Sequence, residues 1–489
     1  MRLRSLKLIY LILLTSLLTS ALFSQNITKF KWPENKITPI FIEFVEAYNT
    51  NDLKKLEAFT TKNYEKDFVK NATYWPSVFA DFGEIEAFRV SKKWTNKNRL
   101  AIWFQGKHTK GWVMIMLRMN KDNTKIIGKG VMRGEKPSGN LPSYNHISSK
   151  EMIPYFKKYI GQLHKLDRFS GSVLIAKGNT ILFEETYGES NKKLGAKNNV
   201  NTSFNIASTT KTFTAIAIAK LAEQGILKFT DPISKLIPEY PKDIANQVTI
   251  HHLLTHTSGI ELDDYKPFNE DVKKAKSMDD LLKAQIKHID SLNEDRRKDF
   301  KVLNRFDYSN ENFSLLGLII ERASGVSYAE YIEKNIFEPL KMKNSFADLH
   351  KLTSHQNIAI GYTYKNTQDE FIGGIRREND KMGGIFLSPA GGIYSTTRDL
   401  YTYFKAINNH SIITKRTHKI LHKKHTKIYG YGFYLSDNGI GHGGVYPGVG
   451  SVFTHHPGTD YYVIILSNYG SMAGSVISNH IHDLLESNN

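Results

Sequence analysis

The chain of 489 residues carries 66 Lys and Arg against 48 Asp and Glu, a formal net charge of +18, and it contains no cysteine. This length suits two or three domains with ample buried core, and the lack of cysteine excludes disulfides, a thiol nucleophile and a lipid-modified cysteine. Lysine is spread along the chain and is not gathered beside stacking aromatic residues. The charge therefore favours a solvated surface with a mild preference for polyanions, such as anionic cell-wall polymer or a membrane surface, and it does not favour a nucleic-acid site.

Residues 1–24 have the pattern of a secretory signal peptide. Arg2, Arg4 and Lys7 precede a mostly apolar run, 8–22, and small residues follow it. Cleavage after this segment is expected, which predicts a periplasmic or extracellular protein. The alternative is an uncleaved membrane anchor, although hydroxyl side chains interrupt the short run. No second segment approaches the length of a membrane span, so no stable span is expected after cleavage.

Residues 27–133 predict a small α+β domain. Apolar residues at helical spacing occur between 40 and 48, and a second short helix is expected with Leu53, Leu56 and Phe59 facing inward. Strand-like runs follow at 86–90, 100–104, 112–119 and 125–132. Helices followed by a curved antiparallel sheet resemble the NTF2-like, cone-shaped fold. A structural or docking role is expected for this domain, and not a second active site.

Residues 134–147 are rich in turn-forming residues and predict a linker. A second domain is expected over 148–489. Its first elements are predicted to be an amphipathic helix and a hairpin, at 152–163, 171–176 and 180–186. A stretch dense in Lys, Asp and Glu at 263–305 predicts a surface insertion or lid.

Ser208 and Lys211 stand three residues apart at the start of an apolar stretch that continues to Leu221. Residues at this spacing share a helix face, so the lysine can reach the serine hydroxyl, and a lysine among apolar side chains can act as a base. Ser208 would lie at the helix N-terminus, where unpaired N–H groups favour an oxyanion. Ser190 and Lys193 have the same spacing but lie in a polar stretch that predicts a surface turn. The simpler alternative is that Ser208 only caps its helix.

Tyr308 and Asn310 precede a second apolar helix, which is predicted at 313–323. A tyrosine held beside a lysine can shuttle a proton to a serine or a leaving group. Asparagine offers both a donor and an acceptor to a substrate amide. Without further context, the two residues would be an ordinary loop before a helix.

His442, Gly443 and Gly444 belong to a glycine-rich segment among strand-like runs. These runs are predicted at 429–435, 451–454 and 461–467. Glycines let a backbone and a ligand approach closely, and an edge strand with a free N–H could complete an oxyanion hole. His442 would point into the same cleft. The alternative is a hairpin turn with an incidental histidine.

His252 and His256 have the spacing of a zinc-binding pair on a helix. Leucine follows His252 where a zinc protease would have its glutamate, and no third ligand is near in the sequence. Neither a metal nor another cofactor is therefore expected.

In this order, the three motifs resemble the serine β-lactamase and penicillin-binding protein superfamily, in its class C and DD-peptidase-like branch. Further matches lie at 226–233, in the His-Leu-Leu-Thr-His-Thr-Ser-Gly segment 252–259, and at 390–400. The resemblance covers the chain from about residue 148 to 489. It implies an α+β fold, in which an antiparallel sheet is flanked by helices and joined by an all-helical subdomain.

The resemblance implies that Ser208 is the acylated nucleophile and that Lys211 is its activating partner. It implies that Tyr308 is the general base and acid and that Asn310 contacts the substrate. It implies that the backbone N–H groups of Ser208 and Val445 hold the oxyanion, with Gly444 and His442 beside them in the substrate site. The family's third motif is usually Lys-Thr-Gly, and here His442 stands in place of the lysine. Neutral histidine binds a substrate carboxylate less strongly than lysine does.

The sequence therefore predicts an exported serine hydrolase that acts on a small-molecule or peptide substrate with an amide or ester bond. Third motifs of the His-x-Gly type resemble those of aminopeptidase, amidase and esterase members. A β-lactamase or D-Ala-D-Ala carboxypeptidase is the first alternative. A non-catalytic penicillin-recognising or wall-binding protein is the second.

Overall fold

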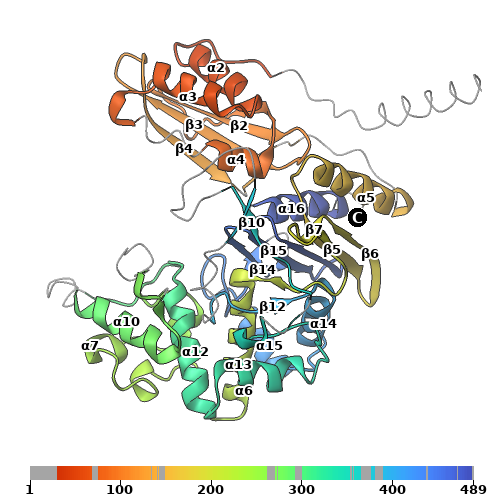
Figure 1. Cartoon of the computed structure of the whole chain (residues 1–489). Coiled ribbons are helices and arrows are strands. Elements are labelled where there is room, and N and C mark those ends of the chain that lie inside the picture. The colour runs from red at the N-terminus through yellow and green to blue at the C-terminus, as the bar shows by residue number, and fades with distance from the viewer. Residues whose placement is uncertain are drawn as a thin grey trace, which may run out of the picture. The chain divides into compact units, whose positions relative to one another are not determined.

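The computed structural model describes residues 30–486 apart from 69–74, 134, 140, 142–148, 261–269, 273, 292–299, 353–354, 356, 365–375, 380–388, 437–438 and 471. The chain divides into two compact units, one of residues up to Lys158 together with those from Asn479, the other Tyr159–Ser478 (Figure 1). The predicted signal peptide and most of the predicted linker lie outside the described residues, and the predicted domain boundaries stay predictions. None of the helices in the described part of the chain has the length and apolar run that a membrane crossing needs.

The first unit packs helices on a four-stranded antiparallel sheet of order β1-β2-β3-β4. Its elements are α2 (Thr38–Asn49), α3 (Leu53–Asn63), α4 (Trp75–Phe82), β1 (Ile85–Val90), β2 (Arg99–Gly106), β3 (Trp112–Met119) and β4 (Ile126–Arg133). Aromatic rings join the layers: Phe41 stacks on Phe104 of β2 at 5.8 Å between ring centroids, and Phe44 packs on Trp75 of α4 at 4.3 Å. The predicted elements of this unit are confirmed, while its NTF2-like assignment stays a prediction.

Leu53 does not face inward as predicted, because its side chain is 37% exposed. The helix α3 begins at this residue, and the side chain of Asp52 caps it by accepting the N–H of Lys54. The buried face of α3 is formed from the second turn onward, by Leu56 and Phe59 among others.

The second unit is built on a six-stranded antiparallel sheet of order β13-β14-β15-β16-β5-β6. The strands are β5 (Gly171–Lys177), β6 (Thr180–Tyr187), β13 (Tyr434–Ser436), β14 (Gly439–Tyr446), β15 (Val449–His456) and β16 (Tyr461–Ser467). The predicted β5–β6 hairpin comes from the beginning of the unit, and β16 comes from near the end of the unit. These segments meet in the sheet, where β5 pairs with β16 and Leu174 lies opposite Ile464. This pairing places the glycine-rich β14 near the other edge of the sheet.

Helices flank this sheet and form a separate helical part (Figure 1). They are α6 (Thr210–Glu223), α7 (Lys242–Ala245), α8 (Ile250–Leu254), α10 (Met278–Asp290), α12 (Asn310–Ser324), α13 (Tyr328–Ile332), α14 (Thr397–Asn408) and α15 (Lys415–Leu421). Two further helices, α5 (Ser149–Lys165) and α16 (Ala473–Glu486), have residues in both units. The helix α6 is buried on nearly every side and packs against α12. A helix that is apolar all round belongs in a core, so the residues at its start are held rigidly.

Two predictions about elements of this unit are corrected. The run 429–435 is not one strand, because Gly432 has φ +77° and the chain folds back so that Tyr429 bridges to Tyr434. The stretch 263–305 is not only a surface insertion, because α10 within it buries Leu281 and Leu282 in the main core and packs on α12. Part of that stretch lies outside the described residues.

Candidate active site

Ser208 lies on a short 3₁₀ helix, η2 (Ala207–Thr209), which leads directly into α6. Ala207 has φ +44°, a left-handed conformation that is uncommon for residues other than glycine and is often found at functional sites. The side chain of Asn205 accepts the N–H of Ala207 at 2.8 Å and supports this turn. The N–H of Ser208 lies in the first turn, where N–H groups have no acceptor within the helix.

Ser451 of β15 holds the same turn from the side of the sheet. Its hydroxyl donates to the carbonyl oxygen of Ile206 at 2.6 Å and lies 2.8 Å from the hydroxyl of Thr209. Both contacts are buried. The position of Ser208 is therefore fixed by the sheet as well as by its own helix.

The side chain of Lys211 is buried beneath Ser208. Its Nζ donates to Ser208 Oγ at 3.2 Å, to Asn310 Oδ1 at 2.8 Å and to the carbonyl oxygen of Ala390 at 2.8 Å. A lysine ammonium has three N–H donors, so each donor has an acceptor. The geometry brings the lysine onto the serine hydroxyl at the helical spacing predicted from the sequence.

Tyr308 reaches the same hydroxyl from the other side, and its OH donates to Ser208 Oγ at 2.9 Å. The ring centroid of Tyr308 lies 4.9 Å from Lys211 Nζ. Ser208, Lys211 and Tyr308 are thus brought together, with Asn310 in contact with the lysine. The proton of Ser208 Oγ can pass to Lys211 Nζ or to the Tyr308 oxygen, provided that the receiving group is in its unprotonated form.

His256 fixes the loop that carries Tyr308. Its ring stacks on the tyrosine ring, with 4.4 Å between centroids, and its Nδ1 accepts the N–H of Ser309 at 3.1 Å. Its carbonyl oxygen also accepts the N–H of Asp307 at 2.8 Å. Burial, and secondarily the charge of Lys211, hold the pKa of His256 well below its usual value, so the ring is neutral.

The zinc-pair spacing of His252 and His256 does not place both residues on one helix. His252 lies in α8 and its Nδ1 bonds to the backbone N–H of Thr249 at 3.1 Å. The chain leaves α8 after Leu254, and His256 has φ +55°. The turn therefore removes the shared helix face that a metal pair would need.

Gly444 lets β14 lie directly against the turn that carries Ser208. A Cβ at this position would meet the Ser208 nitrogen at 2.6 Å and the Ala207 Cβ at 2.7 Å, so a side chain has no room there. Val445, the next residue along β14, is 47% exposed. The two predicted oxyanion donors, the N–H groups of Ser208 and Val445, therefore belong to segments that are in contact, and their role stays a prediction.

His442 is buried on β14, and both ring nitrogens are used within the protein. Nδ1 donates to the carbonyl oxygen of Gly443 at 2.7 Å, and Nε2 accepts from the OH of Tyr429 at 3.0 Å. Burial, with a smaller contribution from Lys211, lowers the pKa of His442 to about 3. The ring is therefore neutral at pH 7, and its predicted contact with substrate stays a prediction.

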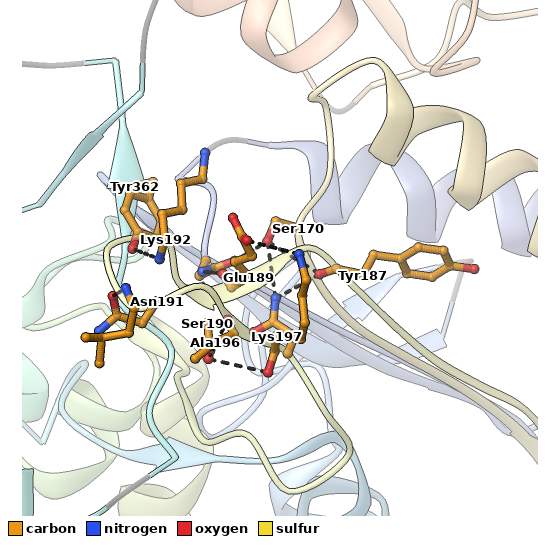
Figure 2. Close-up of polar contacts among 12 residues, drawn as sticks. Ser170, Tyr187, Glu189, Ser190, Asn191, Lys192, Ala196, Lys197 and Tyr362 are labelled. Carbon is orange, nitrogen blue, oxygen red and sulfur yellow. Dashed lines mark hydrogen bonds and ion pairs between the residues drawn. The ribbon is translucent and has the colours of Figure 1, made fainter.

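The second Ser-x-x-Lys spacing is used structurally (Figure 2). Ser190 lies in β7 (Glu189–Asn191), and its hydroxyl lies within hydrogen-bond distance of the carbonyl oxygens of Ala196 and Lys197 in the paired strand β8 (Ala196–Lys197), at 3.3 and 3.5 Å. The predicted surface turn is thus wrong for Ser190, which is a buried strand residue. The exposed turn follows it, at residues 192–195.

Three contacts of the site carried no signal in the sequence. The carbonyl oxygen of Ala390 is a backbone atom, and its reach to Lys211 depends on the tertiary fold. Tyr429 meets His442 only because the chain folds back after it. Ser451 is one of many strand serines. Chemistry alone could have predicted one feature, namely that a buried His442 has a hydrogen-bond partner, because a buried ring nitrogen needs one.

The buried histidines predict loss of stability in acid. Burial is the main cause that lowers the pKa of His422 and of His442 to about 3 each, against about 6.5 in an unfolded chain. Between these values only the unfolded state takes up the proton, so stability is fully present above pH 6.5 and falls as the pH drops towards 3. The slope is up to about 1.4 kcal/mol per pH unit for each histidine.

Urea unfolding of the protein at pH 7.5, 6.5, 5.5 and 4.5 measures this dependence. In His422→Gln, the free energy of unfolding should depend less steeply on pH, because the unfolded state takes up one proton fewer. A free energy of unfolding that stays constant between pH 6.5 and 5 would contradict the prediction.

A serine hydroxyl on a strained turn, contacted by a buried lysine and a tyrosine beside an antiparallel sheet, defines the class of β-lactamase-fold proteins with Ser-x-x-Lys and Tyr-x-Asn motifs. The chain belongs to the β-lactamase family, which matches residues 156–486. The fold is β-lactamase/DD-peptidase-like, as the sequence predicted.

The chain is 30% identical over 329 residues to penicillin-binding protein 4* of Bacillus subtilis (strain 168), across 63% of this chain and 69% of that protein. It is similar in structure to a penicillin-binding protein from Bacillus halodurans, with TM-score 0.56 and 28% identity, across 66% of this chain and 98% of that one. It is also similar to FmtA from Staphylococcus aureus, with TM-score 0.58 and 25% identity, across 72% of this chain and 94% of that one.

Proposed function

We propose that this protein is an exported serine hydrolase that forms an acyl-enzyme on Ser208 with an amide or ester substrate. The observation that carries the proposal is the convergence of Lys211 Nζ at 3.2 Å and Tyr308 OH at 2.9 Å on one serine oxygen. A serine activated by adjacent proton acceptors is the arrangement that nucleophilic catalysis requires. Export rests on the sequence pattern of residues 1–24.

In the first step, Ser208 Oγ attacks the substrate carbonyl carbon and its proton passes to the unprotonated oxygen of Tyr308, either directly or through Lys211 Nζ. The N–H groups of Ser208 and Val445 would hold the tetrahedral oxyanion, since donors placed where charge develops lower the barrier most. The bond to the leaving group then breaks, and Tyr308 returns the proton to the leaving nitrogen or oxygen. Water repeats the attack on the ester of Ser208, which releases the acid and restores the serine.

His442 narrows the substrate class. Its ring is neutral, and its two nitrogens are bonded to Gly443 and Tyr429. The position where the family usually has a lysine therefore supplies no cation to a substrate carboxylate. This supports amides and esters without a free carboxylate next to the scissile bond, and it disfavours a strict carboxypeptidase. The alternative, recognition of β-lactams, is supported by the names of the penicillin-binding relatives.

Two covalent probes test the proposal on the purified protein beside Ser208→Ala. A fluorophosphonate should label the wild-type protein and leave the variant unlabelled. A D-amino-acid amide and the matching dipeptide with a free carboxylate should then differ by less than about tenfold in kcat/KM, which is about 1.4 kcal/mol of discrimination. Labelling by neither the fluorophosphonate nor a fluorescent penicillin would contradict the acyl-enzyme. Penicillin labelling with a strong preference for the carboxylate substrate would favour the alternative.

A further inference from the structure

The chain between Asp399 and Asp437 contains no acidic residue. Six of its basic residues lie within 13 positions on α15 and the turn that follows it, and we call these six side chains the basic face: Lys415, Arg416, Lys419, Lys423, Lys424 and Lys427. No other stretch of this length that the structure describes combines so many cations with a complete lack of acids. The positive charge, which is otherwise spread along the chain, is thus locally concentrated here.

The orientation of α15 turns the basic face outward. Thr417 and Leu421 are the buried residues of the helix, and Thr414 caps its start by accepting the N–H of Thr417. All six side chains of the basic face are exposed. The cap and the buried residues fix the helix on the protein and with it three of the cations, and the other three follow within six residues of its end.

The basic face has no acidic partners in the described part of the chain. The ion pairs of this unit join other residues, such as Lys235 with Asp231 and Arg398 with Glu184. Glu223, the last residue of α6, accepts hydrogen bonds from the N–H and the hydroxyl of Thr414 at 2.8 and 2.7 Å. This carboxylate is engaged by the helix cap and forms no ion pair with the six cations.

An apolar side chain adjoins the basic face. Ile428 directly follows Lys427 and is 46% exposed. A soluble phosphodiester polymer would pair with the lysines and would gain nothing from an isoleucine. A lipid bilayer offers both contacts, because anionic headgroups attract Lys and Arg near the surface and the boundary below them takes up apolar side chains.

We propose that the basic face, together with Ile428, docks this protein on an anionic phospholipid bilayer. Docking of this kind needs no turnover at Ser208, so it stands apart from the proposed hydrolase activity. Tyr429, whose OH bonds to His442, follows Ile428 in the chain. The docking surface and the tyrosine that contacts His442 are therefore adjacent in the chain.

Cosedimentation of the full-length mature protein with vesicles tests the proposal. The protein should bind phosphatidylcholine vesicles that contain about 30% phosphatidylglycerol, fail to bind pure phosphatidylcholine, and lose binding when the salt is raised from about 0.05 to 0.5 M, because salt screens exposed charges. The triple variant Lys419→Gln, Lys423→Gln and Lys424→Gln should bind at least about tenfold more weakly. Ile428→Ser should weaken vesicle binding and leave binding to soluble polyphosphate unchanged.

A matched triple variant in the same unit controls for total charge: Lys193→Gln, Lys242→Gln and Lys343→Gln. These lysines are exposed, as those of the basic face are, and their loss should change vesicle binding by less than about twofold. Equal weakening by both triples would show a general charge effect and overturn the proposal. So would a basic-face triple that loses polyphosphate binding while its vesicle binding stays unchanged, since the occupant would then be a polymer.

Discussion

Gly444→Ala should nearly abolish the reaction of Ser208 with a fluorophosphonate, although it adds a single methyl group. The added Cβ would lie 2.6 Å from the Ser208 nitrogen and 2.7 Å from the carbonyl oxygen of Ile206. Both are backbone atoms, which cannot move aside without shifting either the turn or β14. We expect the labelling rate to fall by at least about 10²-fold, the size of effect seen when one oxyanion donor is lost.

Gly443→Ala is the control for this prediction, since the neighbouring glycine is in the same strand. Its Cβ would lie 3.4 Å from the nearest atom, the carbonyl oxygen of Ser451, so the labelling rate should stay within about threefold of wild type. Urea unfolding should show a loss of about 1–3 kcal/mol for Gly444→Ala, as overpacking usually costs. A Gly444→Ala protein that is folded and labelled at the wild-type rate would show that β14 is not needed at the nucleophile.

Lys211→Met should have the second large effect. Methionine fills much of the same buried space but removes the donor that reaches Ser208 Oγ, Asn310 Oδ1 and the carbonyl oxygen of Ala390. The serine would lose one of its two proton acceptors, which is worth about 10²–10⁴-fold in rate. Stability should fall by about 1–3 kcal/mol, because buried acceptors lose their donor.

Lys220→Met provides the matched control on the same helix. Lys220 is only partly buried, and its Nζ donates to the carbonyl oxygen of Ile412 at 3.3 Å. Its loss should leave fluorophosphonate labelling unchanged. Labelling rates are compared at equal concentrations of folded protein, checked by circular dichroism. Equal rates for Lys211→Met and the wild-type protein would remove the lysine from the proposed mechanism.

The regular elements followed from periodicity, because the side chains of strands and helices are buried with fixed spacing. The hairpin β5–β6 and the strands β3 and β16 lie where apolar runs predicted them. The contact between Lys211 and Ser208 also followed from local spacing, since three residues span almost one helical turn. Local sequence patterns do not predict the other contacts of the site.

The rest of the site depends on tertiary contacts. Tyr308 is 100 residues from Ser208 in the chain, and only the family resemblance brought the two together in advance. The left-handed conformation of Ala207 is set by its neighbours and not by its own side chain. His442 was expected in the cleft, but the fold-back at Gly432 brings Tyr429 to its ring. A Ser-x-x-Lys spacing at Ser190 looked like a turn because the pairing of β7 with β8 is not visible locally.

Peptide mapping by mass spectrometry tests the central claim most directly. Trypsin releases Ser208 in peptide 198–211 and Ser190 in peptide 178–192, so the two Ser-x-x-Lys serines are separated. After reaction with a fluorophosphonate, the adduct should be found on Ser208 in peptide 198–211 and should be absent from Ser208→Ala. An adduct on peptide 178–192, or labelling that persists in Ser208→Ala, would contradict the account.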